Sequence, residues 1–229
     1  MTQSMDLGNS VQPLRNVVAL VMLIKRLETR TFGLPRMATF HGPPGFGKTT
    51  AAAHAAARLD AVYVVVDDMW TKKTLLSQIL IELSLSPKGT GAELMMRVTE
   101  GLARAMRPLI IDEAGIAVER GMIGVIRGIQ DKSNVPVILI GMEDLPQQLN
   151  KWPLVASRIH AWVGAEPADL RDAKLLAKNY APGVDINDAL LEHIVTRNEG
   201  NARTISTDLD YVSEQSKQQG VTKMTLADW

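Results

Sequence analysis

The sequence predicts an α/β fold, with a parallel five-stranded sheet followed by a small helical domain. Five apolar, β-branched runs bounded by polar residues or glycine recur along the chain, and such runs are typical of strands buried on both faces of a parallel sheet. Helical stretches lie between the runs, so strand and helix alternate as in crossover connections. The runs are MATFHG, AVYVVVDD, PLIIDE, VPVILIG and RIHAWV, and the helical stretches are 48–59, 71–83, 91–106 and 120–132.

Both ends of the chain are predicted to be helical. Residues 10–31 form a pattern that is apolar on nearly every side in its middle, so we expect the core or a neighbouring subunit to cover this helix. Beyond residue 165 no strand pattern remains, and three amphipathic segments follow, at 167–180, 186–198 and 202–218. The expected parts are an N-terminal helix in residues 1–36, an α/β domain over 37–165 and a helical domain over 166–229.

The composition excludes several kinds of site. With 229 residues, 46% of them hydrophobic and 22% charged, the chain is long enough to bury a full core. It contains no cysteine, which excludes disulfides and thiolate metal sites, and its four histidines lack the spacing of metal ligands. The longest apolar run, Val17–Ile24, is far shorter than the roughly 20 residues that cross a bilayer, and signal-peptide features are missing. We therefore expect no membrane association and a cytoplasmic location.

The formal net charge is zero, but the charge is unevenly distributed. Residues 1–165 hold 18 Lys and Arg against 14 Asp and Glu, a sum of +4, while residues 166–229 hold 7 against 11, a sum of −4. Chance placement on solvated faces would account for this. The alternative is that a polyanion would meet the first part of the chain.

The stretch HGPPGFGKTT, His41–Thr50, follows the first predicted strand and opens the first predicted helix. Its spacing fits a phosphate-binding loop, in which backbone N–H groups and a helix N-terminus face the phosphates. Lys48 would reach the β and γ oxygens, and the Thr49 hydroxyl would bind Mg²⁺. A plain glycine–proline turn is the alternative, but it would not need the lysine–threonine pair. The residues predicted to bind ATP are Gly42, Pro43, Pro44, Gly45, Phe46, Gly47, Lys48, Thr49 and Thr50.

Two adjacent carboxylates end the third predicted strand, PLIIDE. Asp112, at the strand tip beside the loop, can hold the water shell of Mg²⁺, and Glu113 can orient and deprotonate an attacking water. A pair that merely caps the next helix is the alternative. Two acids in this position favour hydrolysis of ATP over transfer of its phosphate to a second substrate.

Two arginines complete the predicted catalytic set. Arg158, in VASRI, lies just before the last strand, where a neighbouring molecule could receive it as a finger that stabilises charge on the γ-phosphate. Arg203, in GNART, begins the final helix, from which it can reach the same phosphate and report its presence. The alternative for each arginine is an ordinary solvated surface residue.

Together, GPPGFGKT, LIIDE, SRI and GNAR, in this order, resemble the AAA+ ATPases, P-loop proteins whose parallel sheet is followed by a helical lid domain. Within that class, LIGMEDLP and the following ASRI resemble the phage Mu B-type helper ATPases of DNA transposition. The resemblance implies a homo-oligomer, ring or helical filament, with shared ATP sites in the cytoplasm of a bacterium or a phage-infected host. It would assemble on target DNA with ATP and Mg²⁺ bound, present that DNA to a transposase, and leave on hydrolysis.

The chain departs from that family in two places. The polar sensor expected at the end of the fourth strand falls on Gly141, Met142 or Glu143, so its identity stays open. Mu B-type proteins carry an extra N-terminal DNA-binding domain, whereas a single predicted helix precedes MATF here. We therefore expect any DNA contact to come from the ATPase body.

Lys72 and Lys73, in MWTKKT, are the predicted DNA contacts, beside an exposed aromatic candidate, Trp70. Lysines there can neutralise backbone phosphates without reading bases. A solvated helix start with a half-buried tryptophan is the alternative. Three other functions share some of the motifs: a replication initiator or helicase loader, a small-molecule P-loop kinase, and a nucleotide-gated module that does not hydrolyse ATP.

Overall fold

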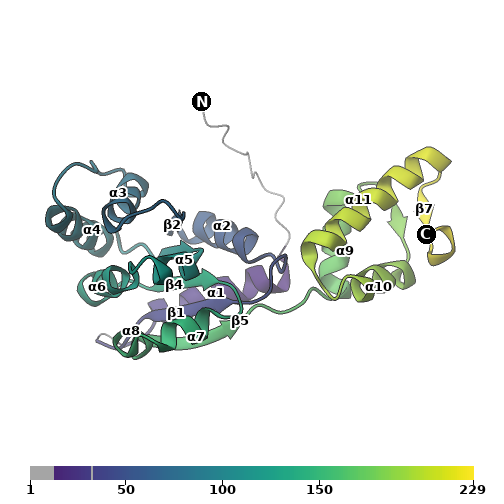
Figure 1. The fold of residues 1–229 in the computed structure, drawn as a ribbon. Helices are drawn as coiled ribbons and strands as arrows, with labels where there is room; N and C mark the ends of the chain where they lie inside the picture. Colours follow the sequence, from purple (N-terminus) through teal and green to yellow (C-terminus); the bar gives the residue numbers. More distant parts are fainter. Residues whose placement is uncertain (1–12, 32) are drawn as a thin grey trace. The chain divides into compact units, whose positions relative to one another are not determined.

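The computed structural model describes residues 13–31 and 33–229, and their contacts form two compact units (Figure 1). The sheet unit comprises the described residues of 19–43 and all of 48–165. The helical unit comprises the described residues up to 18, the short segment Pro44–Gly47, and Glu166–Trp229. The domain limits expected after residues 36 and 165 stay a prediction.

Five parallel strands in the order β2-β3-β4-β1-β5 form the sheet. This arrangement confirms the predicted α/β class and the parallel five-stranded sheet. The expectation of burial on both faces is wrong for the edge strands, because each pairs with only one neighbour, and Val65 and Trp162 are 45% and 39% exposed. The bounds are β1 Met37–His41, β2 Val62–Val65, β3 Leu109–Asp112, β4 Val137–Gly141 and β5 Ile159–Gly164.

The strand register sets where the candidate site residues meet. His41 pairs with Gly141 of β4 and Gly164 of β5, and Asp112 ends β3 opposite Val65 of β2. Because all five strands are parallel, their carboxyl ends lie along one edge of the sheet. Ligands of open α/β sheets bind at this edge.

Helices connect the strands (Figure 1). The predicted helix over 120–132 is present at Ile123–Ser133, but it begins three residues later than predicted, because Gly121, at φ +66°, takes a left-handed conformation that separates it from the helix before it. The short helices α7 and α8 were not predicted. The bounds are α1 Arg15–Glu28, α2 Lys48–Leu59, α3 Lys72–Glu82, α4 Gly91–Ala105, α5 Ala114–Glu119, α6 Ile123–Ser133, α7 Leu145–Asn150 and α8 Pro153–Ala156.

Helix α1 is shorter than predicted within the described residues, and residues 10–12 of the predicted helix lie outside them. Its apolar face is covered by the protein itself, since Leu20, Ile24 and Leu27 are fully buried. Val18 and Met22 of the same helix are 42% and 65% exposed, and coverage of these residues by a neighbouring subunit stays a prediction.

The helical unit packs three helices around an apolar core that includes Leu190, Ile194, Ile205 and Leu209. Its helices confirm the amphipathic segments predicted there, but two short strands also pair in parallel, contrary to the expectation of no strand. A two-residue strand is too short to produce a period in the sequence. The bounds are α9 Leu170–Tyr180, α10 Asp188–Arg197, α11 Ala202–Gln219, β6 Asp185–Ile186, β7 Lys223–Met224 and a final 3₁₀ turn Leu226–Asp228.

Arg15 ties the start of α1 to the start of α9 inside this unit. Its guanidinium lies 2.9 Å from carboxylate oxygens of both Glu166 and Asp169, and its backbone N–H donates to Asp172. Asp169 and Asp172 also form the capping box of α9. One arginine therefore neutralises an acidic helix N-terminus.

Candidate nucleotide site

The loop between β1 and α2 has the backbone of a phosphate cradle. Gly45 and Gly47 adopt left-handed φ angles of +80° and +76°, which other residues reach only with strain. A Cβ at Gly45 would collide with the Asn201 side chain, whereas one at Gly47 would meet no described atom within 4 Å. Gly47 is therefore required by its backbone angle and not by the space around it.

Lys48 is the first residue of α2 and folds back over the loop. Its ammonium donates to the carbonyl oxygens of Gly42 and Pro43, at 2.7 Å each. Burial, and then the charge of Lys48, lower the pKa of His41, which keeps that imidazole neutral at pH 7. The lysine is therefore the cation beside the loop.

The first turn of α2 suits an anion. It holds no acidic residue, and the hydroxyl-bearing Thr49 and Thr50 are exposed. The helix N-terminus is positive and its first N–H groups lack intrahelical partners. These features fit a nucleotide phosphate with its Mg²⁺, and the roles of Lys48 and Thr49 stay predictions.

Asp112 is buried, with 2% of the residue exposed, and two hydrogen bonds hold its carboxylate in place. The Tyr63 hydroxyl donates to its Oδ2 at 3.0 Å, and the backbone N–H of Glu113 donates to its Oδ1 at 2.9 Å. Burial, followed by the charge of Asp112, raises the pKa of the Tyr63 phenol above its ordinary value, so the phenol stays protonated as a donor. Sequence reasoning missed Tyr63, and its only signal was a polar tip within an aliphatic strand.

Glu113 follows the strand in a strained conformation. Its φ and ψ of 55° and 41° are left-handed, which a residue other than glycine adopts at a cost of about 1–3 kcal/mol. Its side chain is exposed, does not cap α5, and makes no hydrogen bond or ion pair among the described residues. The alternative that this pair merely caps the next helix therefore lacks support at Glu113, whose carboxylate is available to act as a base.

Arg203 lies at the start of α11, within the helical unit that also contains Gly45. Its backbone N–H donates to the Gly45 carbonyl at 3.2 Å, and its side chain is exposed. Asn201 caps the helix and donates to the Pro44 carbonyl at 3.2 Å. The loop segment and the arginine predicted to report the phosphate therefore belong to one compact unit.

Asn16 is a second residue that sequence reasoning missed. Its side-chain amide donates to the carbonyls of Phe46 and Glu166 at 2.8 Å each, and its oxygen accepts from the Glu166 N–H at 3.0 Å. The residue is 7% exposed. It ties the loop segment to the first residues of the helical segment, and nothing in its local sequence marks it.

Arg158, the predicted finger, is paired within its own chain. Its Nε donates to Asp131 at 2.7 Å, and the two side chains are 40% and 33% exposed. A surface pair of this kind stabilises by only about 0–1 kcal/mol, so the arginine can exchange this partner for another. Its role across a subunit boundary stays a prediction.

The remaining predicted residues are separate from the loop in sequence, and all of them except the buried Gly141 are exposed. Gly141 ends β4 and accepts a hydrogen bond from the Gly42 N–H at 3.3 Å, while Met142 and Glu143 are exposed beyond it. Lys72 and Lys73 are exposed at the start of α3. The expectation of an exposed tryptophan beside them is wrong, since Trp70 is partly buried against the core of the sheet unit.

The sequence matches a known protein family over most of the sheet unit. The family described as AAA domain matches residues 33–149, just over half of the chain. No curated protein matches the chain in sequence. Within 13–31 and 33–229, no helix has both the length and the apolar character needed to cross a membrane.

Several solved structures are similar in fold. The ORC1 protein of Aeropyrum pernix in complex with DNA is 18% identical at a TM-score of 0.65, and the similarity covers 98% of this chain and 66% of ORC1. The ORC2 protein of the same organism, in ADPNP and ADP complexes, is 15% identical at a TM-score of 0.70, covering 96% and 67%. The RuvB Holliday junction branch migration motor of Thermotoga maritima is 23% identical at a TM-score of 0.60, covering 93% and 66%. The chain thus spans about two thirds of each of these structures, and the similarity establishes the fold.

Proposed function

Because the chain belongs to the AAA domain family and is by class an ATP hydrolase, we propose that it uses ATP to assemble on target DNA and deliver that DNA to a transposase. One observation carries the ATPase part of the proposal. The protein combines a phosphate loop that ends at Lys48 with two carboxylates at the tip of β3. Of these two, Asp112 is fixed by hydrogen bonds and Glu113 is exposed.

The chemistry follows from these residues. Lys48 contacts neutral carbonyl oxygens, so a negatively charged phosphate oxygen would compete favourably for its ammonium protons. Thr49 and Asp112 would hold Mg²⁺, which neutralises phosphate charge when bound. Glu113 would take a proton from water as the water oxygen bonds to the γ-phosphorus, while the bond from that phosphorus to the β–γ bridging oxygen breaks.

Two arginines would respond to the γ-phosphate. Arg203 is exposed on the unit that contains Gly45, which supports its proposed role as a reporter of bound nucleotide. Arg158 is exposed and held by a weak surface pair, which supports its release to a neighbouring subunit. The proposed assembly is a homo-oligomer whose ATP sites are shared between adjacent copies.

DNA and the transposase are the finer part of the proposal. The resemblance of LIGMEDLP and ASRI to the Mu B-type helper ATPases supports a role in transposition. The similarity in fold to an ORC1 protein solved with DNA, and to a branch migration motor, supports contact with DNA. The same ORC similarity favours a second candidate, a replication initiator or helicase loader.

Two measurements test this proposal. ATP turnover is measured with and without duplex DNA, and the full chain is imaged on DNA with a slowly hydrolysed ATP analogue. We expect DNA to stimulate turnover and the analogue to produce rings or filaments on DNA. Turnover that ignores DNA, with the protein monomeric on it, would contradict the proposal.

The downstream partner is tested separately. A strand-transfer assay uses a candidate transposase from the same host, and a loading assay uses the replicative helicase of that host. ATP-dependent stimulation of strand transfer supports transposition. Stimulation of helicase loading alone would favour the initiator role.

A further inference from the structure

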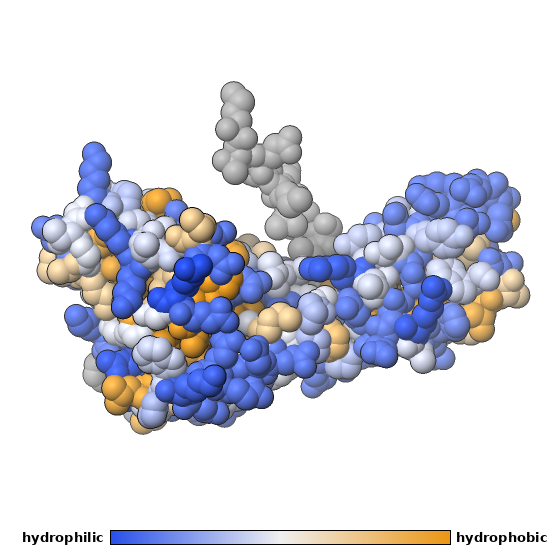
Figure 2. Space-filling view, viewed as in Figure 1, coloured by the Kyte–Doolittle hydropathy of each residue, from blue (hydrophilic) through white to orange (hydrophobic). Residues whose placement is uncertain are grey.

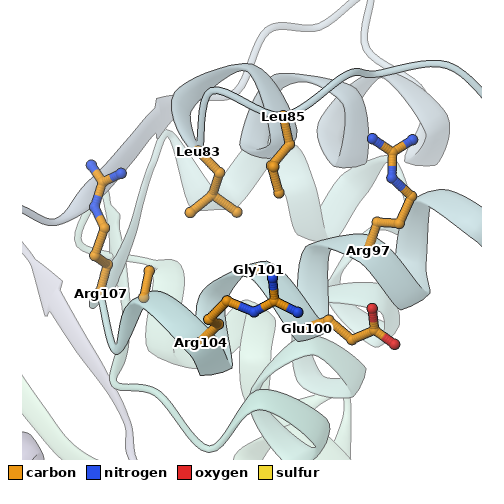
Figure 3. A pocket seen from close by; sticks show the side chains of 8 residues that line it. Leu83, Leu85, Arg97, Glu100, Gly101, Arg104 and Arg107 are labelled. Carbon is orange, nitrogen blue, oxygen red and sulfur yellow. The ribbon is translucent and has the colours of Figure 1, made fainter.

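A pocket of about 440 Å³ lies in the sheet unit between α4 and the segment that follows α3 (Figure 3). Its lining combines leucines with arginines and belongs to none of the elements that hold the phosphate loop or the β3 carboxylates. Over the part of the molecule that contains α3 and α4, apolar and hydrophilic residues are mixed at the surface (Figure 2). The lining residues are Leu83, Leu85, Arg97, Glu100, Gly101, Arg104, Ala105 and Arg107.

Two of the arginines are fixed by backbone carbonyls. Arg97 donates to the carbonyls of Lys88, at 2.9 Å, and Ser86, while Arg107 donates to the carbonyls of Asp60 and Glu82 at 2.6 and 3.2 Å. A carbonyl oxygen accepts a hydrogen bond without cancelling the positive charge. Arg107 forms an ion pair with Asp60, whose side chain is 82% exposed, and the exposed Glu93 interacts electrostatically with Arg97; exposed carboxylates of this kind compensate the positive charge only weakly.

Arg104 is the third arginine and differs from the other two. It is exposed and makes no hydrogen bond or ion pair within the described part of the chain. In Figure 3 its side chain extends beneath Leu85 towards Glu100. The three arginines and one glutamate that line the pocket leave it positively charged, with one guanidinium available to a ligand.

The apolar side of the pocket is formed by Leu83 and Leu85, which point towards α4 (Figure 3). Gly101 makes their approach possible, because a Cβ there would lie 2.9 Å from Leu85 and 3.1 Å from Leu83. Leu85 is still 39% exposed. A glycine inside a helix destabilises the helix by about 1 kcal/mol relative to alanine. At Gly101 the missing Cβ allows two leucines to pack against the helix surface.

We propose that this pocket binds an acidic segment of a partner protein that carries a leucine-sized apolar side chain beside its carboxylates. A guanidinium matches a carboxylate in two parallel hydrogen bonds, and Arg104 is placed to make them. The leucines would bury the apolar side chain between the charged groups. The DNA backbone is the other polyanion of interest, but it presents no apolar group to a concave, leucine-lined pocket.

The test uses a short fluorescein-labelled peptide of alternating leucine and glutamate, titrated with the full chain and followed by fluorescence anisotropy. We expect a Kd of about 10–100 μM at physiological salt. Replacing the peptide's glutamates with lysines, or its leucines with serines, should weaken binding about tenfold or more, since each change removes one half of the match. No binding of the original peptide at about 1 mM overturns the proposal.

Arg104→Glu supplies the matching change in the protein, and Arg58→Glu is the control. Both residues are exposed arginines in the last turn of a helix, so the two variants lose the same favourable interaction with the helix dipole. Arg58 does not line the pocket. We expect Arg104→Glu to weaken peptide binding about tenfold or more and Arg58→Glu to stay within about twofold, because only Arg104 belongs to the pocket lining.

The remaining outcomes distinguish a peptide-binding pocket from a DNA-binding surface. Equal peptide affinity in both variants, or equal binding of the leucine and serine peptides, overturns the proposal. If the peptide does not bind and Arg104→Glu weakens binding of duplex DNA about tenfold, the surface is a DNA contact. Thermal unfolding of both variants checks the fold, and because Arg104 is exposed and makes no hydrogen bond or ion pair among the described residues, an unfolded variant is not expected.

Discussion

The candidate catalytic residues fall into two groups that the structure holds by different means. Asp112 and Glu113 end a buried central strand, where the backbone and Tyr63 fix their positions. Arg158 and Arg203 have exposed side chains, and Arg158 forms an ion pair with a surface carboxylate. In the proposed mechanism the first group works in its own subunit, whereas the second responds to nucleotide or to a neighbour. Substitutions in the first group should therefore affect ATP turnover in a different way from substitutions in the second group.

The largest effect is expected at the phosphate loop. Lys48→Ala removes the cation that the loop carbonyls hold, and we expect ATP affinity to fall by about two orders of magnitude or more. Binding of a fluorescent ATP analogue measures this loss. Wild-type affinity in the folded variant would contradict the assignment of the loop.

Glu113→Gln should separate binding from chemistry. The amide cannot take a proton from water, so we expect turnover to fall by about 10²–10⁴-fold while ATP affinity stays near that of the wild type. Steady-state turnover and analogue binding are measured on the same preparation. An equal loss of binding and turnover would place Glu113 in ground-state contact with nucleotide instead.

Arg158→Ala should act across subunits. We expect turnover to fall about a hundredfold, as for loss of one donor to transition-state charge. Mixing this variant with Glu113→Gln protein should restore part of the activity, because a subunit interface can then combine an intact Glu113 with an intact Arg158. If no mixture exceeds the sum of its parts, the two groups do not share a site.

Asp131→Asn is the matched control for this arginine. It removes the partner of Arg158 within the chain and leaves the guanidinium intact. Turnover near the wild-type value is expected, because the pair contributes only about 0–1 kcal/mol. A loss as large as that of Arg158→Ala would mean that the pair itself is the functional unit.

Tyr63→Phe tests how the first group, Asp112 and Glu113, is held in place. It removes only the hydroxyl that donates to Asp112, so we expect the apparent affinity for Mg²⁺ to fall about tenfold while nucleotide binding without metal is unchanged. Mg²⁺ titrations of turnover, and of the thermal shift given by ADP, measure the two quantities. An unchanged Mg²⁺ dependence would leave the hydroxyl as a packing group.

The sequence predicts the phosphate loop and the β3 carboxylates better than it predicts the residues that support them, because the supporting residues lie far away in the sequence. The glycines, Lys48 and Thr49 lie within one short loop, and the aliphatic run before Asp112 marks its strand, so local pattern is sufficient. Tyr63 contacts a carboxylate 49 residues away, and Asn16 contacts carbonyls 30 and 150 residues away. Long-range partners of this kind arise from the topology of the sheet, which no local pattern contains.

The limits of local sequence pattern also account for the errors in the predicted fold. The five buried runs predict the sheet because hydrophobic burial shapes every residue of a central strand. Helices α7 and α8 have six and four residues, too few to show a helical period. Gly121 could have signalled the break between α5 and α6, since glycine commonly ends a helix in the left-handed conformation.

The smallest effect is expected at Lys72 and Lys73, which lie outside both groups. They are exposed in the first turn of α3, where the helix dipole makes lysine slightly unfavourable, and Thr71 already caps the helix. Partial burial of Trp70 leaves the lysines alone as candidate contacts. Changing both to alanine should weaken DNA binding about equally for all sequences and reduce its salt dependence by roughly one to two phosphate contacts, because backbone contacts carry no base information. Titrations of several duplexes at a series of salt concentrations measure both quantities, with ATP binding of the same variant as the control for folding. An unchanged salt slope in that folded variant would exclude these lysines from the DNA surface.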